Sequence, residues 1–247
     1  MSIKTTLNYS PNFDFKKRSF KQIKFIIFHY TGMKKESEAI KRLTDIQSQV
    51  SCHYLIKKNG EIITMVPESY IAWHAGKSSW RNCRSLNKNS IGIEMVNSGH
   101  DFKYKKFSKK QIISLLRLSK FLIKKYKINI TNILGHSDVA PERKKDPGEK
   151  FPWKYLSQNR VGLWHTIKKH VLLENRNIVS TKMDKEIFFK NLFKIGYSKK
   201  IPKNLNKNRY LRDVIKAFQR RFRQELIDGK IDSECLLISK NLHKIYN

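Results

Sequence analysis

The sequence has few cysteines and no long apolar segment. Its three cysteines, Cys52, Cys83 and Cys235, are far apart and not in a CxxC arrangement, so neither a disulfide framework nor a cysteine zinc site is expected. No run approaches the about 20 apolar residues that a membrane helix needs, and residues 25–28 are too short a run for the core of a signal peptide. We therefore expect a chain without a membrane segment, in a compartment compatible with reduced thiols.

Acidic residues are also scarce. The 20 Asp and Glu residues face 52 Lys and Arg residues, which gives a formal net charge of +32. Such a balance is typical of proteins that bind polyanions such as nucleic acids. The lysines, however, are spread over the whole chain, which indicates a general preference for lysine. We expect no nucleic-acid partner, and another anionic polymer would match the charge equally well.

Apolar periodicity indicates an α/β fold. Residues 23–28 form a nearly continuous apolar run, which predicts a buried strand, and residues 91–96 alternate as a half-buried strand does. Apolar side chains at helical spacing predict helices over residues 36–50 and from residue 108 onward, where a capping box begins. Further strands are expected at residues 53–57, 61–66 and 130–134. Helices and strands in this order predict a sheet flanked by helices.

The pattern changes in the last third of the chain. Residues 172–184 are polar and irregular, as in a linker, and helical patterns follow at residues 185–195 and 211–226. We therefore divide the chain into a first domain, residues 1–175, and a small all-α module, residues 176–247. About sixty residues bury little core alone, so we expect this module to pack against the first domain.

Two histidines stand at the ends of predicted strands. His29 follows the apolar run at residues 23–28, and His136 follows the strand predicted at residues 130–134. Strand ends are where sites assemble in α/β sheets. Asp146 lies ten residues after His136 in a tight-turn sequence, KKDPG. Two imidazoles and one carboxylate form a normal catalytic zinc set that leaves one position for water, although single histidines are more often surface or core residues.

Five sequence blocks occur in a fixed order. They are HYT at 29–31, SCHY at 51–54, WHAG at 73–76, SIGIE at 90–94 and GHSDVAPERKKDPG at 135–148. Together they closely resemble the zinc-dependent N-acetylmuramoyl-L-alanine amidases related to peptidoglycan recognition proteins, in particular the AmiD-like branch. The resemblance covers about residues 20–165, and its last block is the most specific.

The resemblance implies a fold and a cofactor. The fold would be α/β with a central mixed β-sheet flanked by helices, as in peptidoglycan recognition proteins. The cofactor would be one Zn²⁺ per chain, with the ligands falling on His29, His136 and Asp146.

The resemblance also places the catalytic residues on Glu94 and Lys144. Zinc lowers the pKa of bound water to about 7, so Glu94 would take the proton of that water and Lys144 would stabilise the oxyanion. An ordinary strand-edge glutamate and a solvated lysine are the alternatives. Some relatives have a tyrosine where this chain has Cys52, so Glu94 is expected to carry more of the catalysis.

Four further residues are candidates for substrate binding. His74, Trp80, Arg81 and Asn97 lie in or near the motif blocks and would contact sugar or peptide, with packing and loop structure as the alternatives. Asp138 is two residues from His136, and we expect it to support the site or cap a turn rather than to bind metal.

The implied reaction is hydrolysis of the amide between the lactyl group of N-acetylmuramic acid, including its 1,6-anhydro form, and L-alanine of peptidoglycan or muropeptides. The alternatives are a non-catalytic peptidoglycan-binding protein, which would be expected to lose the metal ligands, and a nucleic-acid-binding protein. The all-α module resembles a peptidoglycan-binding module, with a purely structural cap as its alternative. We expect a cytoplasmic monomer, or a periplasmic or wall-released protein if export follows a non-standard route.

Overall fold

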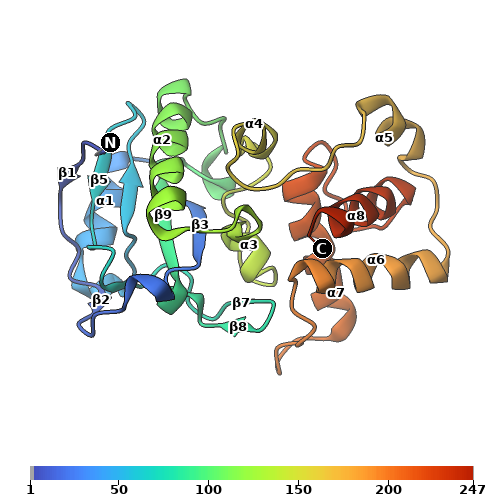
Figure 1. Ribbon diagram of the computed structural model, residues 1–247, viewed down its shortest axis with the longest axis horizontal. Helices are drawn as coiled ribbons and strands as arrows, with labels where there is room; N and C mark the ends of the chain where they lie inside the picture. Colours follow the sequence, from blue (N-terminus) through green and yellow to red (C-terminus); the bar gives the residue numbers. More distant parts are fainter. Residues whose placement is uncertain (1–2, 247) are drawn as a thin grey trace.

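The computed structural model describes residues 3–246, and its centre is a six-stranded sheet (Figure 1). In spatial order the strands are β1 (Thr6–Leu7), β5 (Ile62–Thr64), β4 (Tyr54–Ile56), β9 (Ser90–Met95), β3 (Phe25–Tyr30) and β10 (Ile133–Gly135). The β4–β5 pair is antiparallel, and the other neighbours are parallel. The α/β fold with a central mixed sheet is therefore confirmed.

Two short strand pairs and the helices complete the fold. The pairs are β2 (Phe13–Asp14) with β6 (Ile71–Ala72) and β7 (Ser79–Trp80) with β8 (Cys83–Arg84). The helices are α1 (Glu36–Thr44), α2 (Lys109–Tyr126), α3 (His136–Val139), α4 (Trp153–Gln158), α5 (Lys169–Asn175), α6 (Lys182–Ile195), α7 (Lys207–Phe222) and α8 (Ser233–Tyr246). Short 3-10 turns are η1 (Phe20–Gln22), η2 (Ile46–Ser48), η3 (Leu86–Asn89), η4 (His100–Phe102) and η5 (Ile130–Asn132).

Two predicted elements are shorter than expected, because polar side chains cap new turns inside them. The helix predicted over residues 36–50 ends at Thr44, since the Asp45 side chain accepts a hydrogen bond from the Gln47 N–H and starts η2. The strand predicted from residue 130 begins at Ile133, since Asn129 caps η5 in the same way.

The central strand β3 separates two hydrophobic cores. Ile26 and Phe28 point to one face of the sheet, where they pack with the buried leucines of α2. Phe25 and Ile27 point to the other face and share a core with α6, α7 and α8. Figure 1 shows these helices gathered beside the sheet. The expected packing of the C-terminal helices on the first domain is confirmed.

The start of the C-terminal helical region differs in detail from a simple linker. Leu172 of α5 belongs to the core that α6, α7 and α8 share with β3. The Arg176 side chain, just after α5, pairs with Glu234 of α8. The division of the chain at residues 175 and 176 stays a prediction, and α5 packs with the helices that follow it.

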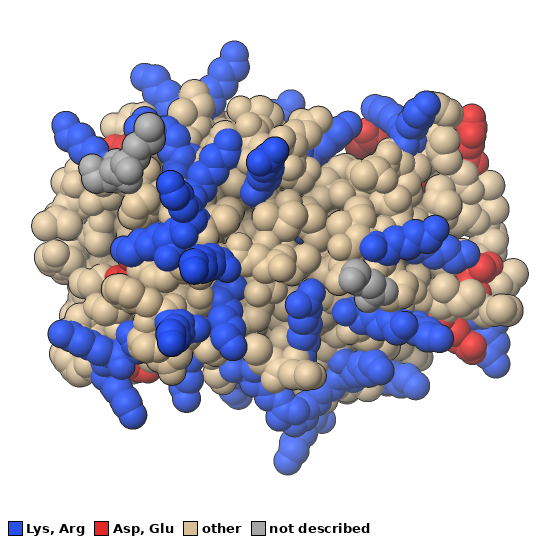
Figure 2. Space-filling view, viewed as in Figure 1, with Lys and Arg blue, Asp and Glu red and all other residues tan. Residues whose placement is uncertain are grey.

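Basic side chains are spread over the surface. Figure 2 shows Lys and Arg over both the sheet half and the helical half of the visible face, with few acidic side chains between them. This distribution agrees with a general preference for lysine rather than a single basic patch on that face. None of the described helices is both long and apolar enough to cross a membrane.

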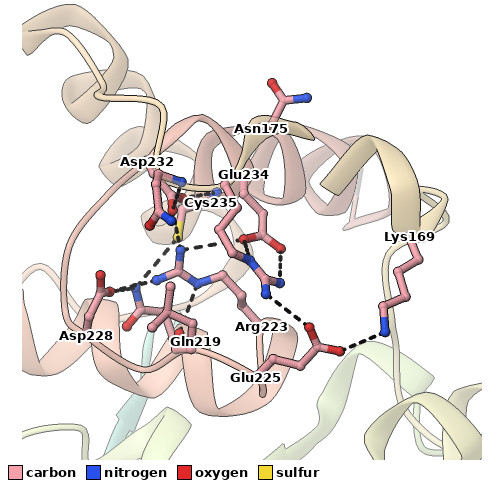
Figure 3. A network of polar contacts seen from close by, with 12 residues as sticks. Lys169, Asn175, Gln219, Arg223, Glu225, Asp228, Asp232, Glu234 and Cys235 are labelled. Atoms are coloured by element: carbon pink, nitrogen blue, oxygen red, sulfur yellow. Dashed lines mark hydrogen bonds and ion pairs between the residues drawn. The ribbon is translucent and has the colours of Figure 1, made fainter. Parts of the chain in front are cut away.

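Buried ion pairs join the ends of α7 and α8 (Figure 3). Arg223, the C-cap residue of α7, lies 2.5 Å from Asp232 Oδ2 and 2.7 Å from Asp228 Oδ1. Glu234, in the first turn of α8, accepts hydrogen bonds from Arg176 Nε at 2.7 Å and Nη2 at 2.8 Å. These contacts fix the loop between α7 and α8 and attach the segment after α5 to it.

We predict that Arg223→Met strongly destabilises the protein. The substitution leaves buried carboxylates without their cation, and breaking a buried pair in this way costs about 3–5 kcal/mol. Lys169→Met is the matched control, because Lys169 pairs with Glu225 at 3.3 Å on the exposed edge of the same network, where a pair contributes at most about 1 kcal/mol. Urea unfolding measures both values, and equal losses for the two variants would contradict the prediction.

Candidate metal centre

Parallel strands bring the predicted site residues to one edge of the sheet. His29 is the next-to-last residue of β3, and its Cα partner on β9 is Glu94. His136 directly follows β10, which pairs with β3 on the other side, and begins α3. Because the three strands are parallel, their carboxyl ends lie together, as is usual for sites in α/β folds.

Asp146 reaches this edge from the loop after α3. The backbone N–H of Ser137 donates to the carbonyl oxygen of Asp146 at 2.8 Å, which fixes the loop against the start of the helix. His29 Nδ1, His136 Nδ1 and Asp146 Oδ2 then form a triangle with sides of 3.0 Å. All three residues are buried. The geometry is that of a candidate metal site.

Neighbouring groups determine which nitrogen of His136 carries a proton. His136 Nε2 lies 3.2 Å from the carbonyl oxygen of Ala75, which can only accept. Nε2 therefore carries the proton, and the lone pair of a neutral His136 is on Nδ1, inside the triangle.

A chain of hydrogen bonds determines which nitrogen of His29 carries a proton. The Ser90 hydroxyl donates to the Leu86 carbonyl oxygen at 2.6 Å, so it accepts from His74 Nε2 at 3.1 Å. His74 Nδ1 must then accept from His29 Nε2, at 3.0 Å. The lone pair of His29 is thus also on Nδ1.

When both histidines are neutral, three acceptors therefore face one another. Burial, together with the charge that a protonated His136 carries, lowers the pKa of His29 to about 4, so His29 is neutral at pH 7. Burial opposes the charge of Asp146, but the two histidines outweigh it and hold the pKa of that carboxyl well below its usual range. A cation satisfies all three acceptors, and a His, His, Asp set with an open position suits a catalytic transition metal.

Glu94 contributes a carboxyl group without a partner. The residue is partly exposed, but its Oε2 is buried and has no hydrogen bond to any described residue. Burial raises the pKa of Glu94 to about 8; Asp146 adds to the rise and Lys144 reduces it. A carboxyl with a pKa near neutrality can both accept and donate a proton, as general acid–base catalysis requires.

One cavity of about 690 Å³ contains these groups. Its lining includes every predicted metal ligand and catalytic residue, namely His29, Glu94, His136, Lys144 and Asp146, together with His74. The Lys144 side chain makes no hydrogen bond or ion pair with the residues the structure describes. Its ammonium group is therefore available to a ligand in the cavity.

His74 lies beside the metal site, held by a glycine. A Cβ at Gly92 would lie 2.4 Å from His74 Cγ, so only glycine at this position leaves room for the imidazole. The space beside Gly92 is filled by the His74 imidazole. His74 contacts His29, so it orients that imidazole as well as lining the cavity.

Trp80, Arg81 and Asn97 do not line this cavity. Trp80 is fully buried and packs against Tyr197, and its role as a substrate contact stays a prediction. Arg81 donates to backbone oxygens of Ile195 and Gly196. Asn97 is buried in a turn, where its side chain bonds the backbone of residues 99 and 105.

Two arginines that the sequence reasoning missed also line the cavity. Arg143 donates to the carbonyl oxygens of Ala75 and Lys77 and so holds the loop beside the site. Its position inside the 135–148 block could have suggested such a role. Arg42 lies on the polar side of α1, where no pattern distinguishes it from the other basic residues.

Comparison with known proteins agrees with this geometry. A family model described as N-acetylmuramoyl-L-alanine amidase matches residues 19–149. The chain is 37% identical over 240 residues to the N-acetylmuramoyl-L-alanine amidase AmiD of Escherichia coli, covering 92% of this chain and 85% of that protein. It is 34% identical over 167 residues to the 1,6-anhydro-N-acetylmuramyl-L-alanine amidase AmpD of Haemophilus influenzae, covering 60% and 88%.

A solved structure gives the same result over nearly the whole fold. The structure of E. coli AmiD in complex with the substrate anhydro-N-acetylmuramic acid-L-Ala-D-gamma-Glu-L-Lys superimposes with a TM-score of 0.78 at 35% identity. The match covers 91% of this chain and 90% of that chain, so it includes the C-terminal helices.

The raised pKa of Glu94 predicts a pH-dependent effect of Glu94→Gln on the metal-free protein. The ordinary pKa of a glutamate carboxyl is 4.5. Below this pH, Glu94 is protonated in both the folded and the unfolded chain, so wild type and Glu94→Gln should differ little in stability. As the pH rises toward 8, only the unfolded chain loses the proton, so wild type loses stability relative to the variant. Thermal unfolding with chelator should give a difference on the order of a few kcal/mol at pH 8.

Glu149→Gln is the control, because its effect on stability should change with pH in the opposite direction. Burial opposes the charge of Glu149, but its hydrogen bond with His100, 2.9 Å long, outweighs this and lowers the pKa of the carboxyl. Wild type should therefore be more stable than this variant at neutral pH, with the gap closing as the pH falls through that pKa. A gap between wild type and Glu94→Gln that is constant from pH 4 to 8 would contradict the assignment.

Proposed function

The chain belongs to the family of N-acetylmuramoyl-L-alanine amidases, and we propose that one zinc ion on His29, His136 and Asp146 enables it to cleave its substrate. The bond cleaved is the amide between the lactyl group of N-acetylmuramic acid and L-alanine. The observation that carries the zinc proposal is the 3.0 Å triangle of His29 Nδ1, His136 Nδ1 and Asp146 Oδ2. Two nitrogens, one oxygen and an open position are a usual donor set for catalytic zinc.

The residues around the site divide the chemistry between them. A zinc ion held by His29, His136 and Asp146 would supply a Lewis acid that activates water and polarises the scissile carbonyl. The Glu94 carboxylate accepts the proton of the attacking water and then donates it to the leaving amine of L-alanine. The Lys144 ammonium stabilises the negative charge that develops on the carbonyl oxygen, as an oxyanion donor does.

The orientation of the site comes from its polar surroundings. His74 and the Ala75 carbonyl oxygen hold the imidazoles of His29 and His136 through their outer nitrogens. Groups that fix ligands in this way reduce the reorganisation that catalysis would otherwise require.

The basic lining of the cavity fits an acidic peptide. Arg42, Arg143, Lys144 and Lys145 all border the cavity, and stem peptides of muropeptides carry free carboxylates. The AmiD relative has been solved with an anhydro-N-acetylmuramic acid peptide. We therefore propose that this chain accepts muropeptides, including those with 1,6-anhydro ends, as well as peptidoglycan.

We predict that zinc and Glu94 are required separately. His136→Ala should lose bound zinc and activity, because it removes a ligand. Glu94→Ala should keep one zinc per chain and lose activity, because it removes only the proton carrier. Metal analysis together with mass spectrometry of products from polymeric peptidoglycan and from anhydro-muropeptides measures both properties. Chelator should abolish activity in wild type, and added zinc should restore it.

Lys144→Ala and Lys145→Ala form a matched pair for the oxyanion role. Both lysines lie on the cavity rim in the same loop, but only Lys144 is proposed to stabilise the oxyanion. Loss of one such donor lowers kcat by about 10²–10³-fold. The kcat of Lys144→Ala should therefore fall by this factor, and the kcat of Lys145→Ala should fall by much less. If zinc-loaded wild type released no stem peptide from either substrate, the amidase proposal would fail.

A further inference from the structure

Asp138 closes the turn that carries His136. It lies on α3, two residues after His136, and is buried to 1% exposure. Its Oδ2 accepts the backbone N–H of Gly135 at 2.8 Å, which caps the four-residue helix at the point where His136 begins. A helix of four residues is not stable by itself. The position of His136 therefore depends on the groups that hold the Asp138 side chain in place.

The other two partners of Asp138 come from the C-terminal helices. Arg221, on α7, donates from Nη1 to Asp138 Oδ2 at 2.6 Å and from Nη2 to the Ile133 carbonyl oxygen at 2.9 Å. Tyr197, just after α6, donates its hydroxyl to Asp138 Oδ1 at 2.8 Å. Both residues are almost fully buried. One carboxylate thus joins the start of α3, the end of β10 and two distant helices.

Arg221 is itself tightly placed. Its guanidinium lies 4.3 Å from the ring centroid of Trp153 and 4.9 Å from that of Phe222. A buried charge held by rings on one side and a carboxylate on the other has little freedom to move. Any shift of Arg221 would therefore be transmitted to Asp138.

Tyr197 also contacts the second loop of the site. Its ring packs against Trp80 with centroids 4.9 Å apart, and the neighbouring Gly196 carbonyl oxygen accepts the Arg81 N–H at 2.7 Å. Trp80 lies on β7, a few residues after the WHAG segment that provides His74 and the Ala75 carbonyl oxygen. The C-terminal helices therefore hold both segments that orient the metal ligands.

We propose that Tyr197 and Arg221 are positioning residues of the metal site: through Asp138 they fix the turn that presents His136, so the C-terminal helices are a working part of the amidase. This inference rests on the proposed function, since it assumes that His136 binds metal. It assigns to the C-terminal helices α6, α7 and α8 a role other than the peptidoglycan binding that the sequence suggests for this part of the chain.

The full-length chain with Tyr197→Phe tests the proposal. This variant keeps the ring against Trp80 and removes one hydrogen bond to Asp138. Zinc affinity, measured by competition with a chelator, should fall about 10-fold, the lower end of what loss of an outer partner usually costs. The visible absorption spectrum of the Co²⁺-substituted protein should shift as well, because the ligand geometry changes.

Tyr210→Phe is the matched control. Tyr210 is also buried in the helical region and also donates its hydroxyl, to the Ser198 carbonyl oxygen at 2.9 Å, but it does not contact Asp138. We expect this variant to lose a similar amount of thermal stability and to keep the wild-type zinc affinity and Co²⁺ spectrum. Arg221→Lys, which keeps the charge and loses one of the two donor arms, should weaken zinc binding at least as much as Tyr197→Phe.

The outcomes separate the two proposals. If wild type binds zinc and Tyr197→Phe matches it in affinity and spectrum while losing stability as Tyr210→Phe does, Tyr197 is only a packing contact and the positioning proposal is overturned. If wild type binds no zinc, the proposed function fails first. If Arg221→Lys does not fold, Tyr197→Phe still decides the question.

Discussion

The convergence of two imidazoles and one carboxylate is the constraint on which the rest of the site depends. His29 Nδ1, His136 Nδ1 and Asp146 Oδ2 lie 3.0 Å from one another, and all three residues are buried. When both imidazoles are neutral and no cation is bound, the three acceptors repel one another. The surrounding hydrogen bonds serve to hold the lone pairs inward, through His74 for His29 and the Ala75 carbonyl oxygen for His136.

The alternation of a single strand connects this site to the rest of the molecule. In β3, side chains at every second position share a face, so His29 follows Phe25 and Ile27 on the side that packs against the C-terminal helices. Ile26 and Phe28 fill the opposite core under α2. The metal site and the helical region are consequently on the same side of the sheet and share one core. Contacts between α7 and the turn after His136 follow from this arrangement.

Much of the site could be predicted from the sequence because its residues stand at strand ends or inside motif blocks. His29 and His136 follow from periodicity and from the rule that sites form at the carboxyl ends of parallel strands, whereas Glu94 follows from the family resemblance of its motif block. The burial of Trp80 could not be predicted, because the residue that covers it, Tyr197, is more than a hundred positions later and has no pattern linking the two. The end of α1 and the start of β10 also differ from the prediction. Asp45 and Asn129 cap short 3-10 turns there, and such local hydrogen bonds interrupt an apolar pattern that continues beyond them.

The scarcity of acidic residues makes the buried ones informative. The chain has 20 acidic residues against 52 basic ones. Asp138, Asp232 and Glu234 each pair with an arginine, and Asp146 faces two histidines. Among residues 3–246, Glu94 alone has a buried carboxylate oxygen without a partner. Because an unsatisfied buried carboxyl reduces stability, its position on the cavity beside the three acceptors is best explained by a partner that the protein chain does not supply: the substrate or the water that attacks it.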